Sequence, residues 1–313
     1  MNENKRPVLS GGIHASITIA LVIMVVAVSA AVIGIYIKMS TLAETLEASR
    51  GVPVMSAGMA GGTDGILLQD SVLGEIWIPI LDGVKPSPYD ENLFQREAGG
   101  FMQYRSDTVK TWNGIDVSFY QQEIDWRQVK ASGIDFAMIR LGYRGYRVGN
   151  VLLDECFEAN VEGALAAGLD VGVYFFSQAT TVQEAAAEAD FVLSYIQDYD
   201  IRYPVVFDWE VIYGNNARSD IVSVQTLTNC AKTFCDKIAA EGYTPMIYAN
   251  KRLALLKYDQ RQLQAYDFWL AEFSSRPSYY YDYKIWQYTE RGRIEGIEGN
   301  VDLNISFVNY SER

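Results

Sequence analysis

An apolar stretch of this sequence ends in two acids. The segment "YPVVFDWE", residues 203–210, runs apolar until Asp208, Trp209 and Glu210. Side chains two positions apart on a β-strand point to the same face, so a strand here aims Asp208 and Glu210 one way and Trp209 the other. Two carboxyl groups, one of them protonated, can do general acid and base chemistry such as cleavage of a glycosidic bond.

Two further acids occupy comparable places: Asp116 in "GIDVS" and Asp302 in "VDLN". Four carboxyl groups that converge on one site raise one another's pKa, which favours a protonated acid. The alternative for each acid alone is that it caps a helix or pairs with Arg140. For four acids at the ends of apolar segments, a catalytic site is the better interpretation.

Apolar segments rich in β-branched and aromatic residues must position these acids. Eight such segments predict strands at 114–120, 136–143, 170–177, 203–210, 244–250, 267–273, 283–289 and 301–307. Apolar residues at helical spacing lie between the earlier ones, around 153–165, 182–196 and 224–238. This alternation predicts parallel strands with crossover helices. The last strands are too close together for a helix each, so we predict an α/β fold, an irregular TIM-like (β/α) barrel with eight strands and fewer than eight helices.

Chemistry in such a barrel gathers at the carboxyl ends of the strands. Aromatic residues at those ends offer flat faces on which sugar rings can stack, although packing in the core is the alternative for each of them. The candidate substrate-binding residues are Arg140, Tyr143, Tyr174, Tyr248, Trp286, Gln287 and Tyr288.

Composition excludes several classes of protein. The formal net charge of -13 disfavours nucleic acid as a partner. The three cysteines form no CxxC pair, and His14 is the only histidine and lies outside every globular part of the chain. We therefore predict no metal site and no cofactor, and a peptidase or amidase built on Cys–His or zinc chemistry is disfavoured.

The N-terminal third has a different character. Residues 17–37 carry no charge and match the roughly 20 residues that cross a bilayer as a helix, whereas a cleaved signal peptide is the alternative. We predict a cytoplasmic tail at 1–16, a transmembrane helix at 17–37, a stalk or linker at 38–111 and the barrel at 112–313. Basic residues do not decide the orientation. Within the stalk, "GEIWIPILDGV" fits a strand, a packing surface or a membrane-facing patch.

Several motifs together resemble glycoside hydrolase family 25, the lysozymes of Streptomyces and of some phages. They are "GIDVSFYQQEIDW", "GVYFFSQATT", "YPVVFDWE", "MIYAN", "FWLAEF" and "IWQYTERGRIEGIEGNVDLN", in the order of the family. The resemblance covers about residues 112–313. It implies an N-acetylmuramidase that cleaves the β-1,4 bond between N-acetylmuramic acid and N-acetylglucosamine in peptidoglycan.

The resemblance also implies roles for the four acids. Glu210 matches the general acid, Asp208 the carboxylate beside it, and Asp116 and Asp302 the flanking pair. Retention assisted by the 2-acetamido group of the substrate, double displacement and inversion all stay open. Because peptidoglycan lies outside the cell, we expect a single-pass protein of the cell membrane with its barrel on the wall side. A peptidoglycan-binding or scaffolding barrel without catalysis is the alternative, and no oligomeric state is predicted.

Overall fold

The structure is a computed structural model that describes residues 65–70, 73–97, 99–212 and 217–312. The predicted transmembrane helix at 17–37 and the tail before it lie outside these ranges. Across the ranges that are described, no helix combines the length and the apolar character that a membrane span requires.

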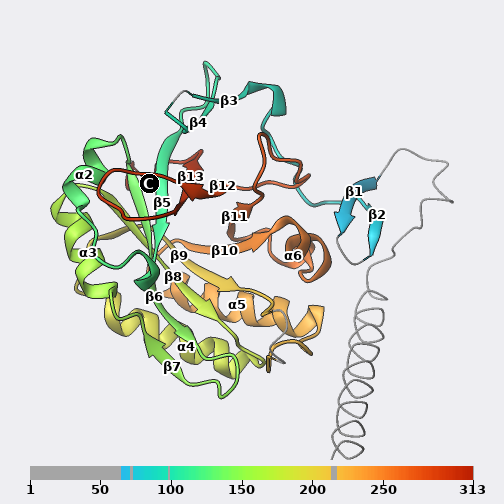
Figure 1. Ribbon diagram of the computed structural model, residues 1–313. Helices are drawn as coiled ribbons and strands as arrows, with labels where there is room; N and C mark the ends of the chain where they lie inside the picture. The colour runs from blue at the N-terminus through green and yellow to red at the C-terminus, as the bar shows by residue number, and fades with distance from the viewer. Residues whose placement is uncertain (1–64, 71–72, 98, 213–216, 313) are drawn as a thin grey trace, which may run out of the picture. The chain divides into compact units, whose positions relative to one another are not determined.

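Eight strands close into a barrel, as the sequence predicts (Figure 1). They are β5 (Trp112–Val117), β6 (Phe136–Arg144), β8 (Asp170–Ser177), β9 (Ile201–Trp209), β10 (Pro245–Asn250), β11 (Asp267–Ala271), β12 (Ile285–Gly292) and β13 (Val301–Ser306). Each strand pairs with the next in this order, and β13 pairs with β5. A short strand, β7 (Val151–Leu153), adds to β6 in antiparallel orientation.

The last strand departs from the predicted parallel pattern. Strands β5 to β12 pair in parallel, but β13 is antiparallel to both β12 and β5. The connection from Gly292 to Val301 is too short for the crossover that a parallel pair needs. Because β13 is reversed, Asp302 reaches the mouth of the barrel from the start of its strand and not from the end.

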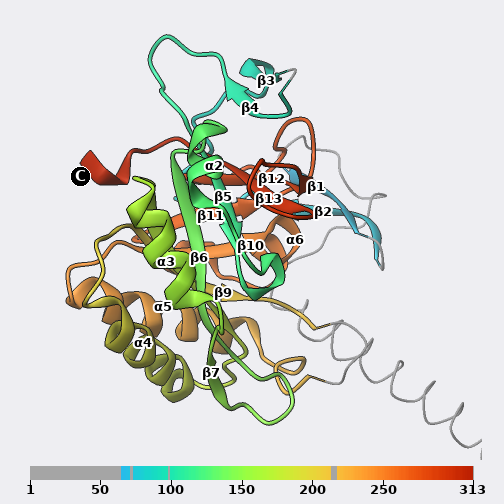
Figure 2. The ribbon, with the colours of Figure 1, turned by 60° about the vertical axis from the view of Figure 1, so that its left-hand side comes forward.

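Three longer helices lie on the outside of the barrel, where the apolar spacing predicts them (Figures 1 and 2). They are α3 (Phe157–Ala166), α4 (Val182–Ile196) and α5 (Val224–Ala240). Thr181 and Ser223 begin α4 and α5, since each side chain accepts a hydrogen bond from a backbone N–H of the first turn. Two shorter helices are α2 (Trp126–Ala131) and α6 (Lys251–Leu256), and short 3-10 helices lie at Glu91–Leu93, Phe119–Gln121, Gln260–Gln262 and Tyr310–Glu312.

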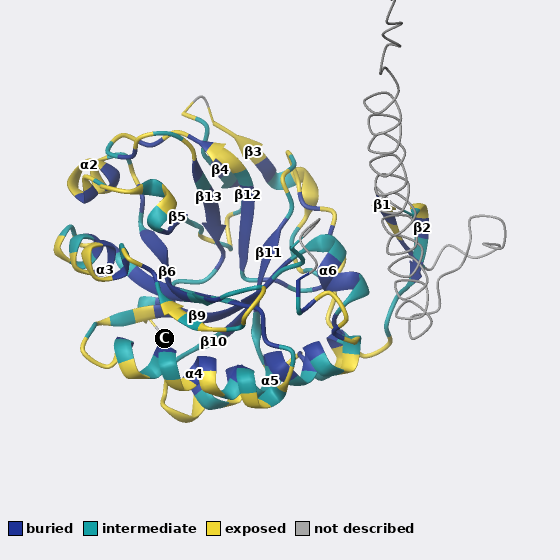
Figure 3. Cartoon of the chain, turned by 60° about the horizontal axis from the view of Figure 1, so that its bottom comes forward, coloured by how far each residue is buried: buried dark blue, intermediate teal, exposed yellow. Residues whose placement is uncertain are grey.

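The core has an inner and an outer part, and Figure 3 shows buried strands inside helices whose outer faces are exposed. The outer part lies between the barrel and its surrounding elements and includes Val205 and Phe207 of β9. Val206, between them, belongs to the separate cluster in the barrel interior. In that interior Phe136 stacks on Tyr203 with ring centroids 4.4 Å apart, and Tyr310 meets Tyr203 edge-on.

Residues before the barrel form two antiparallel hairpins. The first joins β1 (Gly65–Asp70) to β2 (Gly74–Pro79), and the second joins β3 (Phe94–Arg96) to β4 (Met102–Tyr104). Strand β2 begins the segment "GEIWIPILDGV", which is therefore a strand in its first half. Its Ile76 and Ile78 are buried and belong to the outer part of the core. Part of the predicted stalk or linker thus packs as folded structure.

Candidate active site

Asp208 and Glu210 lie at the carboxyl end of β9, as predicted. Asp208 lies two positions after Val206 and therefore on the same, inward face of the strand, and it is 4% exposed. Trp209, between the two acids, is buried in the outer part of the core. Glu210 comes directly after the strand and is partly exposed. Strand alternation therefore places Asp208 in the barrel mouth and leaves Glu210 accessible at its rim.

Asp116 and Asp302 face each other across the junction that closes the barrel. Their Cα positions are direct partners in the antiparallel pairing of β5 with β13. The Oδ2 atom of Asp116 accepts hydrogen bonds from Gln287 Nε2 at 2.8 Å and from Asn304 Nδ2 at 2.7 Å. Two neutral amides thus hold this buried carboxyl group in one orientation.

Electrostatic interactions join the four acids into one cluster. Burial raises the pKa of Glu210 to about 7, and the neighbouring Asp116 adds to the shift. Burial, followed by Glu210 and Asp116, raises the pKa of Asp208 well above its usual range, while Arg140 opposes the rise. Burial and then Asp116 also raise the pKa of Asp302. The cluster therefore retains protons at neutral pH.

Most of the predicted substrate-binding residues lie beside this cluster. Tyr248 donates a hydrogen bond from its hydroxyl to Gln287 Oε1 at 2.9 Å. Burial and then Asp116 raise the pKa of Tyr174. The guanidinium carbon of Arg140 lies 5.4 Å from the ring centroid of Tyr143. These residues place hydroxyl, amide and aromatic groups around the acids.

Trp286 and Tyr288 are corrections to the predicted site. Both are fully buried in the outer part of the core, whereas Gln287 between them bonds to Asp116 in the mouth. Trp286 Nε1 donates to the backbone oxygen of Glu272 at 2.9 Å, and the Tyr288 hydroxyl accepts from the backbone N–H of Met102 at 3.2 Å. Residues on either side of an inward-facing residue must face outward, so these two rings pack on the outer face of β12.

Arg140 does not pair directly with any of the four acids, which was the alternative explanation for them. Its Nε atom donates to Asp154 Oδ2 at 2.7 Å, and the ion pair is buried. Asp154 also accepts from the backbone N–H groups of Phe119 and Cys156. Within the described part of the chain, none of the four acids forms an ion pair, and Arg140 favours the ionised form of Asp208 without a direct contact.

This arrangement suits proton transfer to a bound substrate. One accessible carboxyl group with a pKa near neutrality stands beside buried carboxyl groups, which is the combination that general acid catalysis requires. Among the described residues, no group of three or more His, Cys, Asp or Glu side chains is arranged to hold a metal ion.

A comparison with known families agrees with this geometry. The family model described as "Glycosyl hydrolases family 25" matches residues 115–297, more than half of the chain. The chain belongs to glycosyl hydrolase family 25. The match runs from β5 to β12 and includes Asp116, Asp208 and Glu210. The barrel of this chain is therefore a glycoside hydrolase domain.

Relatives and solved structures place this family 25 barrel near lysozymes. The autolytic lysozyme of Clostridium acetobutylicum is 24% identical over 61% of this chain and 54% of its own length. Lysozyme M1 of Streptomyces globisporus is 28% identical over 61% of this chain and 66% of its own length. A crystal structure of a bacterial lysozyme from Streptomyces coelicolor is 26% identical, with a TM-score of 0.51 over 65% of this chain and 94% of that chain. The chain thus spans about half to two thirds of the length of these two lysozymes.

Three residues that contact the candidate site in this structure were missing from the sequence prediction: Asn304, Asp154 and Gln178. Asn304 lies two positions after Asp302 on β13, so strand alternation was a sufficient signal for it. Asp154 acts through Arg140 from a different element, and no local pattern marks it. Gln178 lies in the motif "GVYFFSQATT", and its Nε2 atom donates to the backbone oxygen of Glu210 at 2.8 Å.

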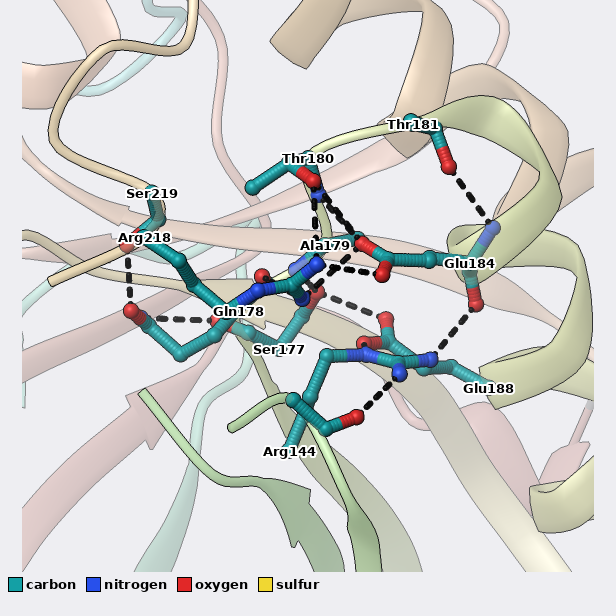
Figure 4. A network of polar contacts seen from close by, with 11 residues as sticks. Arg144, Ser177, Gln178, Ala179, Thr180, Thr181, Glu184, Glu188, Arg218 and Ser219 are labelled. Carbon is teal, nitrogen blue, oxygen red and sulfur yellow. Dashed lines mark hydrogen bonds and ion pairs between the residues drawn. The ribbon is translucent and has the colours of Figure 1, made fainter. Parts of the chain in front are cut away.

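A polar network surrounds Gln178 (Figure 4). Ser219 donates from its hydroxyl to Gln178 Oε1. Glu188, buried on α4, accepts from Ser177 Oγ at 2.6 Å and from Arg144 Nε at 2.5 Å. Burial raises the pKa of Glu188 to about 7, against the lowering effects of Ser177 and Arg144. The network links the end of β8 and the segment at Ser219 to the backbone of Glu210.

Proposed function

We propose that this family 25 protein is a muramidase, which hydrolyses the β-1,4 bond between N-acetylmuramic acid and N-acetylglucosamine in peptidoglycan. The observation on which the proposal rests is Glu210. It is partly exposed at the barrel rim, burial raises its pKa to about 7, and buried acids surround it. The names of the two curated relatives, both lysozymes, support the same substrate class.

In this proposal Glu210 gives its proton to the glycosidic oxygen and then takes a proton from the attacking water. Asp116 helps to keep Glu210 protonated, because its charge raises the pKa of Glu210. Asp302 faces Asp116 across the strand pair and disfavours a second negative charge there. The proton that Glu210 gives up leaves with the released sugar, and the proton that it takes from water restores its neutral form.

Asp208 has a separate role. Its Oδ1 atom is buried and has no hydrogen-bond partner among the described residues. A buried acceptor of this kind is suited to the N–H of the 2-acetamido group of a substrate. We propose that Asp208 is the acid of the cluster that is ionised when substrate is bound. It then stabilises the positive charge on the acetamido nitrogen while the acetamido oxygen attacks the anomeric carbon, so that the configuration is retained.

The location of the barrel is also a proposal. The uncharged segment at 17–37 fits a single transmembrane anchor with the barrel on the wall side of the cell membrane, because the proposed substrate lies there. Extraction of membranes from the producing cells with alkaline carbonate tests this point. A chain recovered in the soluble fraction, shortened at its N-terminus, would favour a cleaved signal peptide.

Product analysis tests the proposed activity. Purified peptidoglycan is digested with the full chain, reduced with borohydride and analysed by mass spectrometry. Muramitol at the new ends is expected, whereas glucosaminitol identifies the other glycosidic bond. Glu210→Gln should bind the polymer without cutting it. A wild-type chain that binds peptidoglycan and releases no reducing ends would favour the non-catalytic scaffold.

A further inference from the structure

The barrel mouth continues into a cavity of about 590 Å³ beside Glu210. The barrel contributes Tyr248 and Phe273 to its lining, and β1 contributes Leu67 and Gln69. This volume lies within the roughly 300–1,000 Å³ that small-molecule sites occupy. The N-terminal hairpin therefore forms part of the wall of a cavity that includes the proposed general acid.

The hairpin is held against the barrel by apolar contacts and an ion pair. Its buried side chains, which belong to the same cluster as the outer part of the core, are Ile66, Leu68, Ile76 and Ile78. Asp70 at the end of β1 pairs with Arg252 of α6, and the Asp70 side chain is fully buried. Because the hairpin precedes residues 115–297, it is an addition to the part of the chain that matches the family.

The cations of the cavity are already paired. Lys251 Nζ donates to Ser278 Oγ at 2.6 Å and lies 3.8 Å from Glu272. Arg252 forms the ion pair with Asp70. A charged ligand would have to displace these partners, so a neutral ligand fits the cavity better.

Apolar side chains in the lining remain open to solvent. Phe273 is 53% exposed and Leu67 is 37% exposed, and Gln69, Asn250 and Ser278 contribute amide and hydroxyl groups to the same lining. A pyranose ring has an apolar face and polar edges, and this combination matches the chemistry of the lining.

We propose that the β1–β2 hairpin completes a saccharide subsite that binds a neutral N-acetylhexosamine unit of the glycan strand next to the bond that is cut. The inference rests on the proposed function for its substrate class. In this inference the hairpin contacts the bound sugar, in addition to any role as a spacer.

Binding of tri-N-acetylchitotriose, a neutral trimer of N-acetylglucosamine, tests the subsite. The full chain with Glu210→Gln is titrated by calorimetry in detergent, alone and combined with Leu67→Ala or Phe273→Ala. Each additional substitution should raise the dissociation constant by about fivefold, because an exposed apolar contact is lost without loss of folding. Val148→Ala is the matched control, since Val148 is 86% exposed and does not line the cavity.

The outcomes separate this inference from the proposed function. If the wild-type chain does not cut peptidoglycan but binds the trimer in a way that depends on Leu67, the proposed muramidase activity is wrong and the proposed subsite is supported. A wild-type chain that cuts peptidoglycan, while Leu67→Ala and Phe273→Ala bind the trimer as well as Val148→Ala does, overturns the subsite. Failure of the trimer to bind, or its displacement by a free stem peptide, also overturns it.

Discussion

Replacement of Glu210 by glutamine should make the protein more stable at alkaline pH while it removes activity. Burial, with Asp116 second, raises the pKa of Glu210 from 4.5 to about 7. The folded state therefore binds a proton more tightly than the unfolded chain does. The free energy of unfolding consequently falls as the pH rises from about 4.5 to 7, because the folded state must ionise a carboxyl group that its surroundings keep neutral.

The size of the effect follows from the pKa shift. One pKa unit corresponds to about 1.4 kcal/mol. A rise in the pKa from 4.5 to about 7 therefore lowers the free energy of unfolding by roughly 3 kcal/mol at a pH above 7. Glu210 is partly exposed, and solvent screening lowers the expected effect to about 2 kcal/mol. Glutamine is neutral at every pH. The free energy of unfolding of the variant should therefore exceed that of the wild type by this amount at pH 8 and by almost nothing at pH 4.

Urea denaturation of both proteins at pH 4, 6 and 8 measures the difference. Glu298→Gln, at an exposed carboxylate between β12 and β13, is the matched control and should show no such trend. Activity of Glu210→Gln should fall by at least about 100-fold. A stability difference that is equal at pH 4 and pH 8 would refute the electrostatic reasoning, whatever the activity shows.

Three other substitutions test parts of the structure around the site. Arg144→Met leaves Glu188 buried without its cation and should destabilise the fold by about 3 kcal/mol at pH 8 and by less at pH 5, where Glu188 is protonated, as chemical denaturation measures. Gln178→Leu removes the hydrogen bond to the Glu210 backbone, and kcat should fall about tenfold with little change in KM; an unchanged kcat would exclude a positioning role. Tyr288→Phe should cost about 1 kcal/mol of stability and leave KM unaltered, whereas a raised KM would return Tyr288 to the substrate site.

The eight strands and three helices were predictable because their signals are local. An apolar segment that is buried on both faces, followed by apolar residues at helical spacing, identifies each β/α unit without knowledge of its neighbours. The acids at the ends of β5 and β9 followed from the same pattern. The direction of β13 did not follow from an apolar segment and a helix, because the described connection from Gly292 to Val301 contains no helix, and its shortness is the signal for the reversal.

The errors in the site have a physical cause as well. Trp286, Gln287 and Tyr288 were all assigned to the mouth, although consecutive residues of a strand cannot share one face. The aromatic character of the two outer residues suggested sugar binding, while their burial against the hairpin of β3 and β4 depends on residues nearly 200 positions away. Contacts between distant segments, such as that of Arg140 with Asp154 or of β1 with α6, have no signature in either segment alone.

Closure of the barrel by β13 makes the site depend on strands that lie far apart in the chain. Asp116 is held by Asn304, which is 188 positions later in the chain, and Asp302 enters only with the same last strand. A chain that lacks β13 contains the segments of Asp208 and Glu210 but has neither the closed barrel nor Asn304, one of the two amides that hold Asp116. The full cluster of acids is therefore in place only when β13 is paired, so that a chain cut before Val301 has no assembled site with which to attack a polymer.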